Sequence, residues 1–140
     1  MAYLDTSVLA AYYCPEGLSE VVGKRLAADR QPTISPLVEV EFCSALAAKV
    51  RARELPERPA GRILSLFQKH LADGLYGRVT LDAAQYALAC KWLTAFSIPL
   101  RAPDALHLAA AFSNDLVLLT ADQGLARASR HFDVQCEFVA

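Results

Sequence analysis

Short apolar runs separated by longer helical stretches are the main pattern along this chain. Residues 116–120 (LVLLT) form the clearest run, which carries no charge and is flanked by polar residues. The other segments expected to be strands are residues 1–4, 33–34, 78–80 and 134–139. Because short apolar strands alternate with helices, the pattern predicts a parallel sheet covered on both faces, in a three-layer α/β/α sandwich.

Apolar positions three and four residues apart predict seven helices along the chain. Ser35 and Pro36 are typical of a helix start, with serine as the N-cap and proline at the first helical position. Pro103 opens a later helix. The expected helices are residues 8–14, 18–28, 35–53, 55–73, 82–96, 104–112 and 123–130.

Length and composition predict one globular domain over residues 1–140. Hydrophobic residues make up 54% of the chain and charged residues 21%, so it can bury a sizeable core. No uncharged apolar run reaches the ~18–20 residues that span a bilayer. The start MAYLDTS lacks a basic region followed by a long apolar stretch, as a signal peptide would have. We therefore expect a soluble, cytoplasmic protein with no membrane partner.

The cysteines argue against two kinds of site. Cys14, Cys43, Cys90 and Cys136 are widely separated and form no C-x-x-C pair. A zinc knot or a thioredoxin-like centre is therefore excluded as an interpretation. We expect these cysteines to fill space in the core.

Two aspartates stand at the carboxyl ends of predicted strands. Asp5 comes after the first strand and Asp122 just after LVLLT. In open α/β sheets, ligands bind outside the carboxyl ends of the strands. Two carboxylates on one rim can share a hard cation, which prefers oxygen ligands. The alternative is that each aspartate only caps the helix or turn that follows it.

Glu41 stands on a helix face that is otherwise apolar in the sequence. At ~100° per residue, one narrow stripe of the helix holds Glu41 together with Leu37, Val38, Ala45, Ala48 and Ala52. A carboxylate on such a stripe is costly unless it is paired or bound to metal. Glu39 points to the opposite side, where solvent or an ion pair suffices. The alternative for Glu41 is a buried salt bridge with an arginine such as Arg101.

Asp104 lies in the first turn of a helix whose remaining residues are almost all apolar. The helix macrodipole favours a negative charge there, so capping is one explanation for this residue. Burial of the helix would instead bring Asp104 to the rim of the sheet. His107, one turn later, is expected to be hydrogen-bonded in the core or beside the acids. Gathered carboxylates need a cation such as Mg²⁺ or Mn²⁺, which suits hydrolysis of a phosphodiester.

Four segments of the sequence resemble the ordered motifs of PIN domains, above all those of VapC-type toxin ribonucleases. They are AYLDTSVLAAYY, ISPLVEVEFCSAL, PDALHLAAA and LLTADQGLARAS. The resemblance covers essentially the whole chain. It implies that the family's four acids are Asp5, Glu41, Asp104 and Asp122, as catalytic residues and metal ligands. Thr6, Ser7 and Thr120 match neighbouring hydroxyl positions that support these acids.

The resemblance also implies an activity and partners. A VapC-like protein is a Mg²⁺- or Mn²⁺-dependent endoribonuclease that cuts RNAs of translation, such as tRNA or ribosomal RNA. It is usually a homodimer and is silenced by a VapB-type antitoxin. Candidate RNA contacts, or else simply a solvated basic face, are Lys49, Arg51, Arg53, Arg58 and Arg62.

Three other functions compete with this interpretation. A phosphatase that forms an aspartyl-phosphate on Asp5 would need a second acid two residues later, where Ser7 stands. A DNA nuclease of related fold would use the same acids. A catalytically idle PIN-like module that only binds a protein would be favoured by an incomplete acid set, whereas all four motif positions carry acids.

Overall fold

Five parallel strands form the centre of the computed structural model, which describes residues 1–15 and 17–140. Their order in the sheet is β3-β2-β1-β4-β5. Tyr3 of the central strand pairs with Thr33 on one side and Leu118 on the other. The strands are β1 (Ala2–Leu4), β2 (Thr33–Ile34), β3 (Gly77–Arg78), β4 (Val117–Thr120) and β5 (Cys136–Phe138). All five lie where the sequence predicts strands or within a residue of it.

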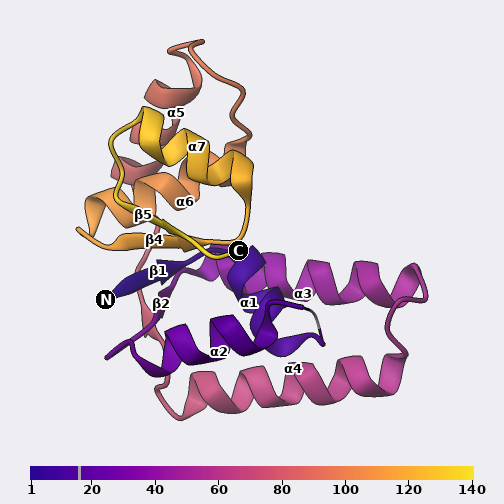
Figure 1. Ribbon diagram of the computed structural model, residues 1–140. Coiled ribbons are helices and arrows are strands. Elements are labelled where there is room, and N and C mark those ends of the chain that lie inside the picture. The colour runs from indigo at the N-terminus through magenta and orange to yellow at the C-terminus, as the bar shows by residue number, and fades with distance from the viewer. Residues whose placement is uncertain (16) are drawn as a thin grey trace.

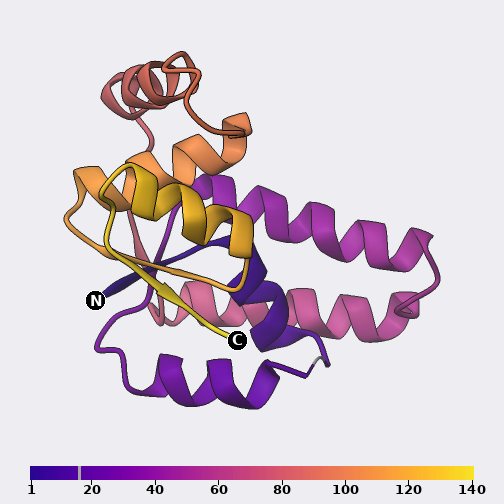
Figure 2. The ribbon, with the colours of Figure 1, turned by 45° about the horizontal axis from the view of Figure 1, so that its top comes forward.

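Helices cover both faces of this sheet, as Figure 1 shows. On one side lie α1 (Thr6–Tyr13), α2 (Ser19–Ala27), α3 (Pro36–Arg51) and α4 (Glu57–Ala72). On the other side lie α5 (Ala83–Leu93), α6 (Ala102–Ser113) and α7 (Gln123–His131). Helices α3 and α4 form a long hairpin that extends well beyond the sheet (Figures 1 and 2). The predicted three-layer α/β/α architecture with a short-stranded parallel sheet is confirmed.

The core is built on β1, β4 and α6. All three residues of β1 are buried, as are Leu118 and Leu119 of β4. In α6 every residue from His107 to Ala111 is buried. Strands buried on both faces need continuous apolar runs, which explains why the two central strands have the clearest sequence signal.

Helix α3 differs from the sequence prediction in which face it buries. Its buried residues are Val38, Phe42 and Leu46, whereas Ala48 and Ala52 are exposed. The stripe that holds Glu41 therefore lies at the edge of the packed face, and Glu41 is half-buried. The stripe was mis-assigned because alanine fits solvent as readily as a core, and the far half of α3 extends past the sheet.

Several element ends also differ from expectation. Helix α3 ends at Arg51 because Arg53 takes a left-handed conformation with φ of 59°, which closes the helix. Helix α6 begins at Ala102, two residues before the expected start. Helix α5 ends at Leu93 instead of residue 96.

The cysteine prediction is wrong for two of the four residues. Cys14 is buried and Cys136 is half-buried, but Cys43 and Cys90 are exposed on helix surfaces. In the part of the chain that the structure describes, no helix has the length and apolar character needed to cross a membrane.

Candidate active site

Asp5 joins the ends of the two central strands. It follows β1 directly and is 4% exposed. Its Oδ1 accepts hydrogen bonds from Ser7 Oγ at 2.6 Å and from the backbone N–H of Val8 at 3.2 Å. Its Oδ2 accepts from Thr120 Oγ1, the last residue of β4, at 2.7 Å. Asp5 thus caps α1, as the capping alternative proposed, and it is also held across the sheet by two hydroxyl groups.

The hydroxyls of Ser7 and Thr120 also fix the backbone after β4. Ser7 Oγ accepts from the N–H of Ala121 at 3.0 Å, and Thr120 Oγ1 accepts from the N–H of Asp122 at 3.0 Å. Each hydroxyl therefore donates to Asp5 and accepts from the chain that leads to Asp122. These bonds set the position of one aspartate relative to the other.

Asp122 is the N-cap of α7. Its Oδ1 accepts from the backbone N–H of Leu125 at 3.1 Å, so the capping alternative holds for this residue too. Asp115, which precedes β4, lies at the opposite end of that strand. Of Asp115 and Asp122, it is therefore Asp122 that shares the carboxyl edge of the sheet with Asp5.

Glu41 connects three helices at the same edge. Its Oε1 accepts from Thr6 Oγ1 of α1 at 2.8 Å and from His107 Nε2 of α6 at 2.5 Å. Glu39, by contrast, forms a 2.8 Å ion pair with Arg78 on the surface. The expected separation of the two glutamates is confirmed. The alternative of a buried salt bridge between Glu41 and Arg101 is not what the structure shows: Glu41 pairs with His107, and Arg101 lies 3.5 Å from Asp104.

A buried polar chain lies behind Glu41. His107 Nδ1 is 2.8 Å from the hydroxyl of Tyr3, which is 2.8 Å from Ser35 Oγ. If the imidazole is neutral, its Nε2–H donates to Glu41 and its Nδ1 accepts from Tyr3. His107 is therefore the hydrogen-bonded histidine that the sequence predicted. Ser35 precedes α3 without a side-chain capping bond, because its hydroxyl is used here.

Sequence reasoning missed Tyr3, although a signal for it exists. Tyr3 stands two residues before Asp5 in extended backbone, and residues two apart in a strand point to the same side. A tyrosine in this position therefore faces the same layer as the acid. Burial raises the pKa of Tyr3, and the nearby charges of Asp5 and Glu41 raise it further.

The pKa values indicate how the acids affect one another. Burial raises the pKa of Asp5, against the opposing hydrogen bonds from Ser7 and Thr120. Burial also raises the pKa of Asp104, and the neighbouring charge of Asp122 adds to the rise. For Glu41, burial is outweighed by the His107 hydrogen bond and charge, so its pKa is lowered. Electrostatic interaction with His107 opposes the rise at Asp5 and Asp104 and adds to the lowering at Glu41, so all three carboxyl groups lie within electrostatic range of that side chain.

The acids are nevertheless turned toward protein partners. Within residues 1–15 and 17–140, no three His, Cys, Asp or Glu side chains stand close enough to hold one metal ion together. Asp104 faces Arg101, while Glu41 faces Thr6 and His107. Asp104 and Glu41 are both half-buried, so each carboxyl group remains partly accessible to solvent.

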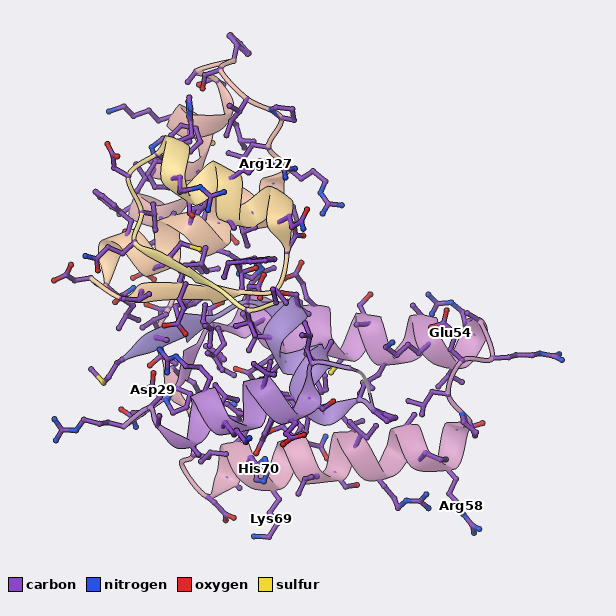
Figure 3. The ribbon with its side chains drawn as sticks, viewed as in Figure 1. Asp29, Glu54, Arg58, Lys69, His70 and Arg127 are labelled. Atoms are coloured by element: carbon purple, nitrogen blue, oxygen red, sulfur yellow. The ribbon has the colours of Figure 1, made fainter. Side chains whose placement is uncertain are left out.

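The basic residues expected to contact RNA lie elsewhere. Lys49 and Arg51 are in the last turn of α3, and Arg58 and Arg62 are in α4. Arg51 is ten residues beyond Glu41, about 15 Å along the helix axis. Figure 3 shows Glu54 and Arg58 near the free end of the hairpin. Contact between RNA and these basic residues of α3, α4 and the turn between them stays a prediction.

The PIN domain family model matches residues 2–131 of this chain. The chain therefore belongs to the PIN domain family. A comparison with curated proteins finds no match.

Several solved structures share this fold. FitAcB from Neisseria gonorrhoeae is 21% identical with a TM-score of 0.68, and the match covers 97% of this chain and 96% of that one. VapBC2 from Rickettsia felis, bound to a DNA fragment from its promoter, is 14% identical with a TM-score of 0.72 over 100% of both chains. VapC20 from Mycobacterium tuberculosis, described as a sarcin-ricin loop cleaving toxin, is 16% identical with a TM-score of 0.71, over 91% of this chain and 95% of that one. At these identities the likeness concerns the fold alone.

Proposed function

We propose that this chain is a metal-dependent endoribonuclease that hydrolyses RNA phosphodiester bonds and acts as the toxin of a VapB–VapC-type pair. Its main support is that Asp5, Glu41 and Asp122, which are far apart in sequence, are all held by hydrogen bonds at one edge of the sheet. Membership of the PIN family supports the same conclusion. The matching positions for the family's acids are all occupied by Asp or Glu.

The donors at this edge suit a hard divalent cation. Asp5, Glu41, Asp104 and Asp122 offer carboxylate oxygens, which Mg²⁺ and Mn²⁺ prefer. Burial raises the pKa of Asp5 and of Asp104, and a bound cation would favour the ionised form of both carboxylates. Such an ion, when bound, activates water and stabilises negative charge on the phosphate under attack. These four residues are the ones we propose to hold it.

The surrounding side chains orient the acids for this task. Ser7 and Thr120 donate to both oxygens of Asp5, which fixes the plane of its carboxylate. Thr6 and His107 hold Glu41 by one oxygen, Oε1. Groups that hold ligating carboxylates in place strengthen metal binding. We assign this orienting role to Thr6, Ser7, Thr120 and, in addition, His107.

Partners follow from the same proposal. The structures of similar fold include VapBC and FitAB pairs, which supports a VapB-type antitoxin as the inhibitor. One neighbour is described as cleaving the sarcin-ricin loop, which supports an RNA of translation, from the tRNA or rRNA class, as the substrate. We further propose a homodimer that acts in the cytoplasm.

Digestion of matched RNA and DNA oligonucleotides of one sequence tests the proposal. With Mg²⁺ or Mn²⁺ the chain should cut the RNA internally, and EDTA should stop the reaction. Asp5→Asn should be inactive, since an amide keeps the capping bond to Val8 but removes the charge. Cleavage of DNA alone would show a DNA nuclease. If neither DNA nor any of several structured RNAs is cleaved, the result would favour the catalytically idle module that only binds a protein.

A further inference from the structure

A pocket opens beside Asp104 and Asp122, between the loop that precedes α6 and the helix α7. Its volume is about 420 Å³, within the range of roughly 300–1,000 Å³ typical of small-molecule sites. Its apolar wall consists of Ile98, Pro99, Leu100, Leu125 and Ala128. Both acids also line it, so the pocket is continuous with the proposed catalytic edge.

Two arginines line the same pocket, Arg101 from the loop and Arg127 from α7. Arg101 is largely exposed and leans toward Asp104 at 3.5 Å. Arg127 is also exposed, and among the described residues no carboxylate lies within ion-pair distance of it. Its guanidinium therefore keeps its donors for a ligand.

Gly124 keeps the space between Asp122 and Arg127 open. A Cβ at this position would lie 3.2 Å from Asp122 Oδ1 and 3.9 Å from Arg127 Nη2. The acid and the guanidinium therefore flank one small volume that a side chain would fill. A side chain at position 124 would therefore narrow the pocket between Asp122 and Arg127.

We propose that this pocket binds the nucleotide next to the cleaved bond, with Arg127 holding its phosphate and the apolar wall receiving its base. This inference rests on the proposed nuclease function. A nucleotide carries a flat ring with apolar faces and, a short distance away, an anionic phosphate. The pocket offers an apolar wall for the ring and the Arg127 guanidinium for the phosphate. Arginine suits the anion because its planar fork can make two hydrogen bonds to phosphate oxygens.

The position of Arg127 sets it apart from the other basic surface of the molecule. Figure 3 shows Arg127 on α7, on the opposite side of the sheet from Arg58 and Lys69 on α4. Arg130, one turn further along α7, lines a second pocket together with Phe138 and Arg127, but it does not line the pocket beside the acids. Arg130 is therefore a matched control, with the same charge and the same helix but outside the pocket beside the acids.

The test combines nucleotide binding with cleavage, using the whole chain and the variants Arg127→Gln and Arg130→Gln. AMP, CMP, GMP and UMP are titrated one at a time in Mg²⁺ buffer while backbone amide resonances are followed by NMR. A mononucleotide has no phosphodiester to cut, so this readout does not depend on activity. At least one nucleotide should shift the amide resonances of residues 98–101 and 124–128. Arg127→Gln should weaken its binding at least roughly tenfold, as expected for loss of a charged arginine–phosphate contact.

On a short single-stranded RNA, Arg127→Gln should raise KM by a similar factor with kcat changed less than about twofold, and Arg130→Gln should change neither. Equal effects of the two variants, or shifts that fall outside the pocket, would overturn the proposal. The two hypotheses fail separately. A wild-type chain that cuts no RNA refutes the nuclease function, and the NMR titration still shows whether the pocket binds a nucleotide. A chain that cuts RNA but shows no shift in the pocket refutes only the pocket.

Discussion

Nε2 of His107 lies 2.5 Å from Oε1 of Glu41, and this bond joins α6 to α3 across 66 positions of sequence. The histidine is buried, and the glutamate is half-buried at the carboxyl edge of the sheet. Glu41 is therefore a carboxylate held in place at one oxygen. Glu39, two residues earlier, makes only a surface ion pair with Arg78.

The two glutamates should consequently respond differently to loss of charge. Glu41→Gln removes a proposed metal ligand and should lower the rate of RNA cleavage at least about 100-fold, while it weakens Mn²⁺ binding. Glu39→Gln should change both by less than about twofold, because surface ion pairs contribute little. Cleavage assays and Mn²⁺ titrations check this. Similar losses in both variants would show that Glu41 has no special role.

Thr120 should contribute to stability through the two bonds of its hydroxyl. Thr120→Val keeps the shape but leaves Asp5 Oδ2 without its donor and the N–H of Asp122 without its acceptor. We expect a loss of about 1–3 kcal/mol in the free energy of unfolding, measured in urea without metal. The control is Thr80→Val, which removes a similar hydroxyl–carboxylate bond to Asp82 on the surface. Thr80→Val should lower the free energy of unfolding by less than about 0.5 kcal/mol. Equal losses in the two variants would contradict the stabilising role of Thr120.

The hydroxyl of Tyr3 should matter for the same reason. Tyr3→Phe leaves His107 Nδ1 and Ser35 Oγ without a shared partner in a fully buried setting. The free energy of unfolding should fall by about 1–3 kcal/mol. Tyr86→Phe is the matched control, since Tyr86 is 52% exposed. If urea unfolding shows no difference between the two variants, the buried chain does not stabilise the fold.

Most elements and the edge that holds the acids could be predicted from the sequence, because apolar periodicity and strand-end aspartates are local signals. The helix face of α3 could not be predicted. Which side of a helix is covered depends on where the sheet ends, and Ala48 and Ala52 lie on the uncovered side. The partner of Glu41 was equally out of reach, since nothing local distinguishes His107 from Arg101 as the residue that folds against it.

Stability should fall in alkaline solution. Burial raises the pKa of Tyr76 to about 12, while an unfolded tyrosine ionises near 10. The contribution of neutral Tyr76 to the free energy of unfolding is therefore complete below pH 10. It is lost as the pH rises from 10 to 12, by up to about 2–3 kcal/mol. Urea unfolding at pH 8 to 11 measures it. In Tyr76→Phe the fall should be smaller than in wild type, and an identical fall would contradict the assignment.

Mn²⁺ binding tests the central claim, that Asp5, Glu41, Asp104 and Asp122 gather around one cation site. Calorimetric titration of the wild-type chain should show saturable binding. Asp5→Asn, Glu41→Gln, Asp104→Asn and Asp122→Asn should each weaken it about tenfold or more. Asp115→Asn, at the other end of β4, should bind like the wild type. No saturable binding, or the same affinity in all five variants, would contradict the account.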